Sequence, residues 1–250
     1  MISVCMATYN GERFLREQID SILCQLNPED ELIISDDGST DGTLEIIASY
    51  QDSRIKLLHH KKKPEYEKIK YSRNFYYATD NFENALTAAQ GDYIFLADQD
   101  DVWMENKVKV MCTLLDEFDC VMCNNQIIDA DGKPLNFFLG EKPPFSSSVF
   151  LNLKRTPFLG CCMGFSHRAL KYILPFPKNL ICHDLWMGCL CANRKSLLYL
   201  QNPLHQYRYH ENSVSPSVTK KSKNSILFRI KYRLFFLIQF YQRLLNKKYS

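Results

Sequence analysis

The chain has 250 residues, of which 46% are hydrophobic and 24% charged, so it can bury a substantial core and is not a disordered chain. Its length allows one α/β domain or two small ones. The formal net charge of +3 is unevenly distributed, because residues 220–250 carry nine Lys or Arg and no acid, which leaves about −6 on the rest. We therefore expect a mildly acidic body followed by a basic tail.

Strand-like and helix-like segments alternate in the first part of the chain. Residues 2–7, 31–35 and 55–58 are apolar runs typical of buried strands. Residues 14–26 and 41–48 lie between them and carry apolar residues at helical spacing. Two strand–helix repeats followed by a third strand predict a parallel sheet with right-handed crossovers.

A fourth apolar run, residues 93–97, is followed directly by Asp98, Asp100 and Asp101. Carboxylates this close repel one another, and a divalent metal such as Mn²⁺ or Mg²⁺, which prefers oxygen ligands, would hold them together. The alternative is an acidic loop that only caps a helix starting near residue 105.

Polar residues follow three of these predicted strands, at residues 8–12, 36–39 and 98–101. Ligands bind outside the carboxyl ends of the strands in parallel sheets, so the three segments together predict one ligand site. The basic segment 59–70 follows the third strand and is interpreted either as a cover for phosphates or as a solvated loop.

The middle of the chain alternates in the same way. Residues 74–90 and 108–118 are predicted helices, and residues 120–128 form one or two predicted strands before a hairpin turn at Asp131-Gly132. Residues 133–158 are rich in loop-forming residues.

Two glycines, Gly160 and Gly164, lie in the apolar segment 158–165. The backbone could approach a ligand closely there, and ordinary core packing explains the glycines equally well.

His183, Asp184 and Trp186 lie close together in the sequence. Asp184 could start a helix, where the helix dipole favours a carboxylate, or it could act as a general base beside an aromatic sugar platform. The sequence leaves both interpretations open. Further on, Arg208 and His210 alternate along a predicted strand, where they could meet a diphosphate or its metal, or could lie on the surface.

Ten cysteines could indicate disulfides, but Met1 leads directly into a strand-like pattern and no leader sequence precedes it. We therefore expect a cytoplasmic protein with reduced thiols. Cys120 and Cys123 have the spacing of a metal-binding pair, but residues three apart in a strand face opposite ways. Buried free thiols are therefore favoured over a zinc site.

Five motifs, taken in order, resemble those of a bacterial family 2 glycosyltransferase with the nucleotide-sugar-binding GT-A fold. They are Met6-Ala-Thr-Tyr-Asn-Gly11, Ile34-Ser-Asp-Asp-Gly-Ser-Thr-Asp-Gly42, Leu96-Ala-Asp-Gln-Asp-Asp-Val-Trp103, His183-Asp184-Leu-Trp186 and Tyr207-Arg208-Tyr-His210-Glu-Asn212. The third and fourth motifs most resemble the rhamnosyltransferase-like branch.

The resemblance implies an α/β fold with a Rossmann-like, mostly parallel central sheet flanked by helices, followed by an amphipathic C-terminal helix. It covers residues 1–215. We expect residues 1–130 to form the nucleotide-sugar-binding half, residues 131–215 the acceptor half, and residues 216–250 a basic amphipathic helical tail.

The resemblance also implies roles for single residues. Asp184 would be the catalytic base, and Asp100 and His210 would hold the metal, although the acids also permit an alignment in which Asp98 or Asp101 is the principal ligand. Asp36 would contact the base and Asp98 the ribose. The residues that would line the nucleotide-sugar pocket are Ala7, Thr8, Tyr9, Glu12, Asp36, Asp98 and Arg208. The residues that would shape the acceptor pocket are Gly160, Gly164, His183 and Trp186.

The implied reaction is an inverting transfer from a nucleotide-diphosphate sugar to a hydroxyl of a glycan or lipid-linked acceptor in bacterial cell-surface polysaccharide synthesis, with Mn²⁺ or Mg²⁺ as cofactor. dTDP-rhamnose is the first expected donor and a UDP-sugar the second. A sugar-phosphate nucleotidyltransferase would open with a Gly-rich loop containing a basic residue, which residues 7–11 lack. A catalytically silent nucleotide-sugar-binding protein would have no need of Asp184.

Residues 225–245 carry an apolar arc at helical spacing, with three basic residues in the first half that make a membrane-spanning helix unfavourable. We expect an in-plane helix on an anionic membrane, which would place the enzyme on the inner face of the cell membrane. The alternative is a helix packed on the body or on a partner subunit. The many Leu, Ile and Phe residues argue against a nucleic-acid contact, and the sequence does not predict the oligomeric state.

Overall fold

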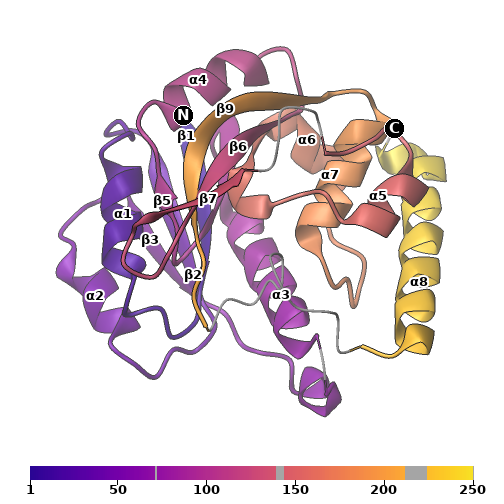
Figure 1. The fold of residues 1–250 in the computed structure, drawn as a ribbon, viewed down its shortest axis with the longest axis horizontal. Coiled ribbons are helices and arrows are strands. Elements are labelled where there is room, and N and C mark those ends of the chain that lie inside the picture. The colour runs from indigo at the N-terminus through magenta and orange to yellow at the C-terminus, as the bar shows by residue number, and fades with distance from the viewer. Residues whose placement is uncertain (71, 139–143, 212–223, 250) are drawn as a thin grey trace.

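One central sheet organises the structure. A computed structural model describes residues 1–250 except residues 71, 139–143, 212–223 and 250. In the described part, nine strands form a single sheet with helices on both faces (Figure 1). The strands are β1 (Ile2–Thr8), β2 (Glu31–Asp36), β3 (Ile55–His59), β4 (Tyr93–Asp98), β5 (Val102–Trp103), β6 (Cys120–Ile128), β7 (Pro134–Phe138), β8 (Met163–Ser166) and β9 (Leu197–Arg208).

Helices connect most of these strands. Short 3₁₀ turns follow β3 at Pro64–Lys68, precede β8 at Gly160–Cys162 and follow the last helix at Lys247–Tyr249. The α-helices of the described residues are α1 (Leu15–Leu23), α2 (Thr43–Ser49), α3 (Arg73–Ala88), α4 (Lys107–Leu115), α5 (Val149–Arg155), α6 (His167–Ile173), α7 (His183–Asn193) and α8 (Ile226–Leu245).

The strand order is β3-β2-β1-β4-β8-β6-β9-β5, with β7 beside β6. Strands β1 to β4 pair in parallel, as do β6 and β9, and β8 runs antiparallel to both of its neighbours, β4 and β6. Strands β1, β2, β3, β4, β6 and β9 therefore point the same way. The predicted α/β fold, with a mostly parallel sheet flanked by helices and a C-terminal helix, is confirmed.

The order of the first four strands locates a ligand-binding edge. The chain moves outward from β1 through β2 to β3, and then returns to the other side of β1 as β4. The connections on the two sides of β1 run in opposite directions, and in parallel sheets ligands bind at the carboxyl ends of the strands where this happens.

Two elements of residues 133–158 escaped prediction, namely β7 and α5. Strand β7 begins at Pro134 and pairs with β6 alone, and such an edge position is where a strand tolerates proline. Helix α5 has seven residues, which is too short to give a clear helical period. Strand β9, which carries Arg208, is longer than the strand predicted around that residue and continues through Pro203, where its pairing with β6 shifts register.

All ten cysteines lie in the described part of the chain and are free thiols, as predicted. The thiol of Cys120 lies beside Cys191, and that of Cys123 lies beside Cys162. The two sulfur atoms therefore have different neighbours, which agrees with their expected placement on opposite faces of β6.

The tail helix α8 is part of the core. Phe236 and Phe240 are completely buried, and their ring centroids lie 5.7 and 6.4 Å from that of Trp186 in α7. Arg243 donates hydrogen bonds to the carbonyl oxygens that end α6, at 2.8 Å from Tyr172 and 2.9 Å from Ile173. The predicted tail therefore packs on the body through one face.

Replacing Phe236 by Ala tests this packing. We expect Phe236→Ala to lower the free energy of unfolding by about 3–5 kcal/mol, because it removes a fully buried ring and leaves a cavity. Ile238→Ala is the matched control on the exposed side of the same helix, and we expect less than about 1 kcal/mol there. Urea unfolding followed by circular dichroism measures both. Equal effects of the two substitutions would show that α8 does not pack as described.

Candidate active site

Three strands end side by side at the predicted ligand-binding edge. In the register of the sheet, Thr8 of β1 pairs with Asp36 of β2, and Ala7 of β1 pairs with Asp98 of β4. The three polar segments expected to meet are therefore adjacent, because the parallel pairing carries all three strand ends to one edge.

Asp36 organises the turn that follows β2. It is almost fully buried, and its carboxylate accepts hydrogen bonds from the hydroxyl of Thr8 (3.1 Å) and from the backbone N–H groups of Gly38 and Ser39 (2.8 and 2.9 Å). The positive φ of Gly38 (76°) suits glycine, which lets the chain turn back over the carboxylate. The predicted contact of Asp36 with a nucleotide base would be additional to these bonds.

The loops after β1 and β4 are tied together by Gln99. Its amide oxygen accepts a hydrogen bond from the N–H of Tyr9 (2.8 Å), and its amide nitrogen donates to the carbonyl oxygen of Tyr9 (3.2 Å). A Cβ atom on Gly11 would lie 2.4 Å from the Gln99 amide oxygen, so a larger residue there would displace the Gln99 amide. Glu12 then accepts a hydrogen bond from the N–H of Gly42 (2.6 Å), next to α2.

The three acids after β4 have different surroundings. Asp101 is buried, and its two oxygens bind the Nε2 of His205 and the backbone N–H of Arg208, both at 2.8 Å. Asp100 is partly exposed, and its Oδ2 lies 2.7 Å from the Nε2 of His210. The structure thus brings together Asp100 and His210, the two residues predicted to hold a metal.

Electrostatic repulsion marks this cluster. Burial, and then the charges of Asp101, Asp100 and Asp184, raise the pKa of Asp98 well above its ordinary value. Burial and the charge of Asp100 raise the pKa of Asp101 to about 8. Carboxylates from β4, from the turn after it and from α7 therefore lie close enough to disfavour one another's ionisation.

Arg208 clamps the acidic turn from β9. Its Nε donates a hydrogen bond to the carbonyl oxygen of Asp100 (2.8 Å), and the rest of its guanidinium contacts the carboxylate of Glu17 (2.5 Å) and the carbonyl oxygen of Ala130 (3.2 Å). Arg208 is 2% exposed. It was predicted to bind the nucleotide sugar, but its guanidinium nitrogens are already engaged by protein oxygens, so these contacts support a positioning role.

A buried lysine extends this network, and sequence reasoning missed it. Lys107, in the first turn of α4, is fully buried, and its Nζ lies 2.7 Å from the carbonyl oxygen of Cys161 and 3.1 Å from the Nδ1 of His205. An ammonium group can only donate, so the Nδ1 of His205 accepts and its Nε2–H donates to Asp101. Lys107 therefore holds His205 in the tautomer that binds Asp101.

Lys107 also makes a second group of possible metal ligands unfavourable for a cation. Ligand atoms of Cys161, Cys162 and His205 lie within 4.8 Å of one another. The ammonium of Lys107 already binds His205 there, and a second cation beside it would be repelled. The only sequence signal for Lys107 was its position four residues after Trp103, over whose ring its Nζ lies at 4.3 Å from the centroid.

Asp184 lies in the first turn of α7 and faces the acidic cluster across Gly160. A Cβ atom on Gly160 would lie 3.1 Å from the Nε2 of His183 and 3.6 Å from the Cβ of Asp184, so Gly160 leaves room beside both residues. Burial raises the pKa of Asp184 to about 6 and lowers that of His183 to about 3. Near neutral pH the carboxylate can therefore accept a proton, and His183 is uncharged.

Two of the predicted acceptor residues lie inside the core. Trp186 has no exposed surface, because Phe236 and Phe240 cover it and its Nε1–H donates to the carbonyl oxygen of Ile173 (3.1 Å). Gly164 lies in buried β8, where a Cβ atom would meet the ring of Phe95 at 2.9 Å. Neither residue offers a surface to an acceptor, so both have packing roles here.

The basic segment after β3 folds back over the predicted nucleotide edge. The Nζ of Lys62 lies 2.8 Å from the ring centroid of Tyr9, whose side chain is otherwise exposed. His60 lies 2.5 Å from Asp37, next to Asp36. The segment predicted to cover phosphates or remain solvated thus contacts the site, and Lys62 is a cation that sequence reasoning did not single out.

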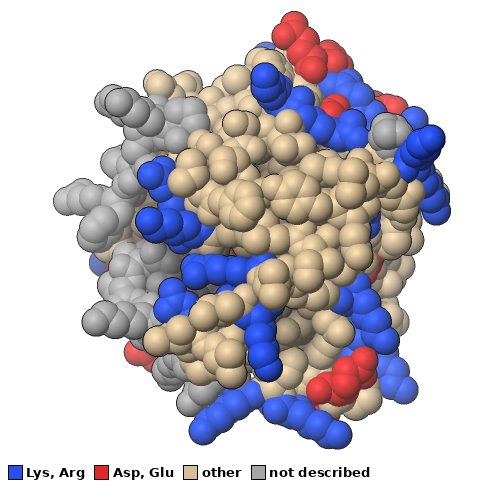
Figure 2. Space-filling model, turned by 90° about the vertical axis from the view of Figure 1, so that its right-hand side faces the viewer, with Lys and Arg blue, Asp and Glu red and all other residues tan. Residues whose placement is uncertain are grey.

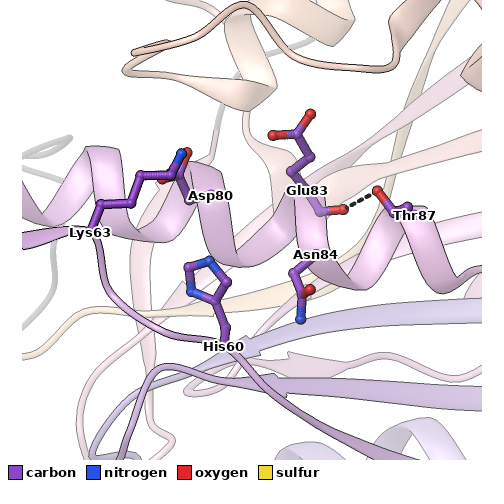
Figure 3. Close-up of a pocket in the computed structure, with 6 residues that line it drawn as sticks. All are labelled: His60, Lys63, Asp80, Glu83, Asn84 and Thr87. Carbon is purple, nitrogen blue, oxygen red and sulfur yellow. Dashed lines mark hydrogen bonds and ion pairs between the residues drawn. The ribbon is translucent and has the colours of Figure 1, made fainter.

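A polar cavity of about 240 Å³ lies beside this edge, between α3 and the segment after β3 (Figure 3). His60 and Lys63 line it from one side and Asp80 from the other, and the ammonium of Lys63 reaches Asp80 at 2.7 Å (Figure 3). Asn84 also lines the cavity and donates to the hydroxyl of Ser35 in β2 (2.8 Å). The cavity therefore borders the ends of β2 and β3.

The acidic cluster fits a hard divalent cation. Asp100 and His210 offer an oxygen and a nitrogen at one partly exposed point. Burial raises the pKa of Asp98, and the neighbouring carboxylates raise it further, and a cation would offset the second effect. Asp101 is less suited, because both of its oxygens already have protein partners. Donors of this kind suit Mn²⁺ or Mg²⁺.

Several known proteins are similar to this chain. It is 29% identical over 245 residues to a putative teichuronic acid biosynthesis glycosyltransferase, TuaG of Bacillus subtilis, with 95% of this chain and 90% of that protein covered. It is 27% identical to the Escherichia coli UDP-Glc:alpha-D-GlcNAc-diphosphoundecaprenol beta-1,3-glucosyltransferase WfgD, covering 89% and 83%. It is 28% identical to the dTDP-rhamnosyl transferase RfbG of Shigella flexneri, covering 87% and 76%.

Solved structures share the fold. Residues 1–349 of S. aureus TarS in complex with UDP-GlcNAc superpose with a TM-score of 0.63 at 16% identity, covering 97% of this chain and 72% of that one. The model of the family described as glycosyl transferase family 2 matches residues 3–174, which include the ends of β1, β2 and β4. With this match over more than half of its length, the chain belongs to glycosyl transferase family 2.

Proposed function

We propose that this protein is an inverting, metal-dependent glycosyltransferase that moves a sugar from a nucleotide-diphosphate sugar to a hydroxyl of a glycan or lipid-linked acceptor. One observation carries the proposal: at the switch point of the sheet, Asp184 of α7 lies near the end of β4, with Gly160 packed between it and Leu96, and burial together with the charges of Asp100 and Asp184 raises the pKa of Asp98. A binding protein would have no need of a proton acceptor on the far side of this cluster from the nucleotide.

The donor nucleotide lies along the ends of β1 and β2 in this proposal. Ala7, Thr8, Tyr9 and Glu12 line its pocket, with Asp36 contacting the base and Asp98 the ribose. Lys62 lies on the ring of Tyr9, so a base that stacks there displaces it toward the phosphates, where its positive charge is favourable. Arg208 positions Asp100 and Asp101 and does not itself bind the nucleotide.

Asp100 and His210 would hold the Mn²⁺ or Mg²⁺ ion, which would supply a Lewis acid for the departing diphosphate. In support, the mannosyltransferase PcManGT of Pyrobaculum calidifontis, which shares the fold with a TM-score of 0.56 at 16% identity, was solved in complex with GDP-Man and Mn2+. His205, held by Lys107, occupies one oxygen of Asp101, whereas Asp100 is partly exposed and pairs with His210, the other proposed ligand of the ion.

Asp184 is the proposed general base. Its carboxylate removes the proton of the acceptor hydroxyl while the oxygen attacks the anomeric carbon on the face opposite the leaving diphosphate, and this single displacement inverts the centre. His183 is uncharged and packs on Phe82 with ring centroids 4.3 Å apart, so it fixes the start of α7. Gly160, which has no side chain, lets the backbone pass close to both His183 and Asp184.

The donor and the pathway are proposed from the relatives. The Shigella relative's name gives a dTDP-rhamnosyl donor, and the E. coli relative's name gives UDP-Glc with a diphosphoundecaprenol-linked acceptor. We therefore propose dTDP-rhamnose first and a UDP-sugar second, with a lipid-linked acceptor of bacterial surface polysaccharide synthesis at the inner face of the cell membrane.

We propose that the parts of the chain have the functions expected from the sequence. Residues 1–130 form the donor half, residues 131–215 the acceptor half and residues 216–250 the tail, although one sheet joins the two halves. The boundary between acceptor half and tail, together with Asn212 of the last motif, lies outside the described residues.

Replacing Asp184 by Asn tests the base. We expect the turnover of Asp184→Asn to fall by roughly 10²–10⁴-fold, with little change in nucleotide affinity, because the amide cannot accept the proton. Transfer is followed by release of the nucleoside diphosphate, and affinity by calorimetry. Glu117→Gln, which removes an exposed carboxylate from the turn after α4, is the control and should be unaffected. Normal turnover of Asp184→Asn would refute the assignment.

The pH profile tests the same residue in the native protein. Asp184 works as a base only when it is ionised, and its pKa is raised to about 6, so kcat/KM should fall as pH decreases through about 6. Below that point we expect about a tenfold loss for each pH unit. A rate that stays constant from about pH 7 to about pH 5 would contradict this role.

Thermal unfolding tests the metal and the donor class without an activity assay. We expect UDP or dTDP to raise the melting temperature when Mn²⁺ is present, and EDTA to abolish the shift, because Asp100 and His210 would hold a cation that favours diphosphate binding. Asp100→Asn should reduce the shift, whereas Glu105→Gln, an exposed neighbour, should not. The nucleotide with the larger effect identifies the donor class. A shift that ignores EDTA would contradict the metal proposal.

A further inference from the structure

Helix α8 exposes a continuous apolar face. Seven large apolar residues of this helix are between 44% and 82% exposed, although the opposite side of the helix is packed on the body. Ile226, Ile230, Leu234 and Ile238 follow one another at intervals of four, so they form one row along the helix. We call this row, together with Leu227, Tyr241 and Leu245, the apolar face of α8.

The helix is held in place by contacts that leave this face free. Phe236 and Phe240 insert against Trp186, and the guanidinium of Arg243 binds the carbonyl oxygens at the end of α6. These contacts fix the orientation of α8. With Phe236 and Phe240 turned toward the body, the apolar face of α8 is turned toward the surroundings. A large exposed apolar surface on a globular protein marks an interaction site.

Basic residues border the apolar face. Arg229 and Lys231 are exposed beside its first half, and Lys247 and Lys248 follow its last turn. Residues 220–250 contain no acid. Figure 2 looks onto the side of the molecule where α8 lies and shows a broad area without charged side chains, bordered mainly by Lys and Arg.

We propose that the apolar face of α8 docks on an anionic lipid bilayer, with the helix lying in the plane of the interface. An exposed apolar row with basic flanks and no acid suits a surface that is apolar inside and negatively charged outside. A second copy of the chain is less favoured, because a symmetric contact through the same face would bring the two sets of basic flanks together. Among the described residues no helix has the length and hydropathy to cross a bilayer, which agrees with an in-plane helix.

This docking bears on the proposed reaction. Tyr232, on the packed side of α8, lies beside Cys182, which immediately precedes His183 and Asp184. Trp186 beneath α8 is two residues after Asp184 in the same helix. A bilayer bound to α8 would therefore lie on the side of the molecule that carries the proposed base. The docking of α8 would bring the proposed base close to a lipid-linked acceptor. That connection rests on the proposed function.

Vesicle binding by the full-length chain tests the proposal. We expect the protein to sediment with vesicles of phosphatidylcholine and phosphatidylglycerol, more weakly with phosphatidylcholine alone, and less at high salt. Leu234→Ser with Ile238→Ser should lower the bound fraction by about tenfold or more, because less apolar surface enters the interface. Arg229→Gln with Lys231→Gln should remove the preference for phosphatidylglycerol. Val110→Ser, an exposed apolar residue of α4, is the matched control and should bind normally.

The point variants are preferable to removal of the tail, which would uncover Trp186. Because the replaced residues are exposed, their urea unfolding should match that of the native chain, and their response to UDP should remain. Absence of vesicle binding by the native chain, or full binding by Leu234→Ser with Ile238→Ser, would overturn the proposal. So would a dimer, seen by sedimentation velocity, that these two substitutions dissociate. Vesicle binding is measured without substrate, so a protein that fails to bind vesicles would contradict only the docking proposal. A protein that binds vesicles but transfers no sugar would contradict only the proposed transfer reaction.

Discussion

Repulsion among carboxylates is the constraint on which the site depends. Asp98, Asp100 and Asp101 lie at the end of one strand, and Asp184 influences the charge of the first. Two buried cations lie nearest to them. Lys107 binds the carbonyl oxygen of Cys161 and the Nδ1 of His205, and the guanidinium of Arg208 binds the carbonyl oxygen of Asp100 and the carboxylate of Glu17, so neither pairs directly with these three carboxylates. The cluster as a whole therefore keeps an excess of negative charge, and a divalent cation bound at Asp100 would make the folded cluster more favourable.

The sheet explains why these residues meet. Because β4 returns to the side of β1 opposite β2, the ends of three parallel strands come together, and Gln99 joins the loops that leave two of them. Helix α7 brings Asp184 to the same edge from the other half of the chain, with Gly160 as the space between helix and strand. Helix α8 covers α7 from outside. The donor side, the base and the exposed apolar face thus follow one another across the molecule.

The sequence predicted what is local and missed what depends on distant contacts. Apolar runs that end in acids predicted the strands and their common edge, and the family resemblance implied that Asp100 and His210 act together. The burial of Trp186 could not be predicted, because it depends on which side of α8 faces the body. The sequence analysis did not single out Phe236 and Phe240, the two residues of α8 that are fully buried against the body. Lys107 reads as an ordinary helix cation, and only the pairing of β5 with β9 brings His205 to it.

Anomalous diffraction at the manganese edge, from crystals grown with Mn²⁺ and a nucleoside diphosphate, tests the central claim most directly. The account predicts one strong peak within coordination distance of the Asp100 carboxylate, between the diphosphate and the ends of β1 and β4, with Asp184 facing the same space. A peak bound elsewhere, such as at Cys161, Cys162 and His205, or a diphosphate bound without any ion near Asp100, would contradict it.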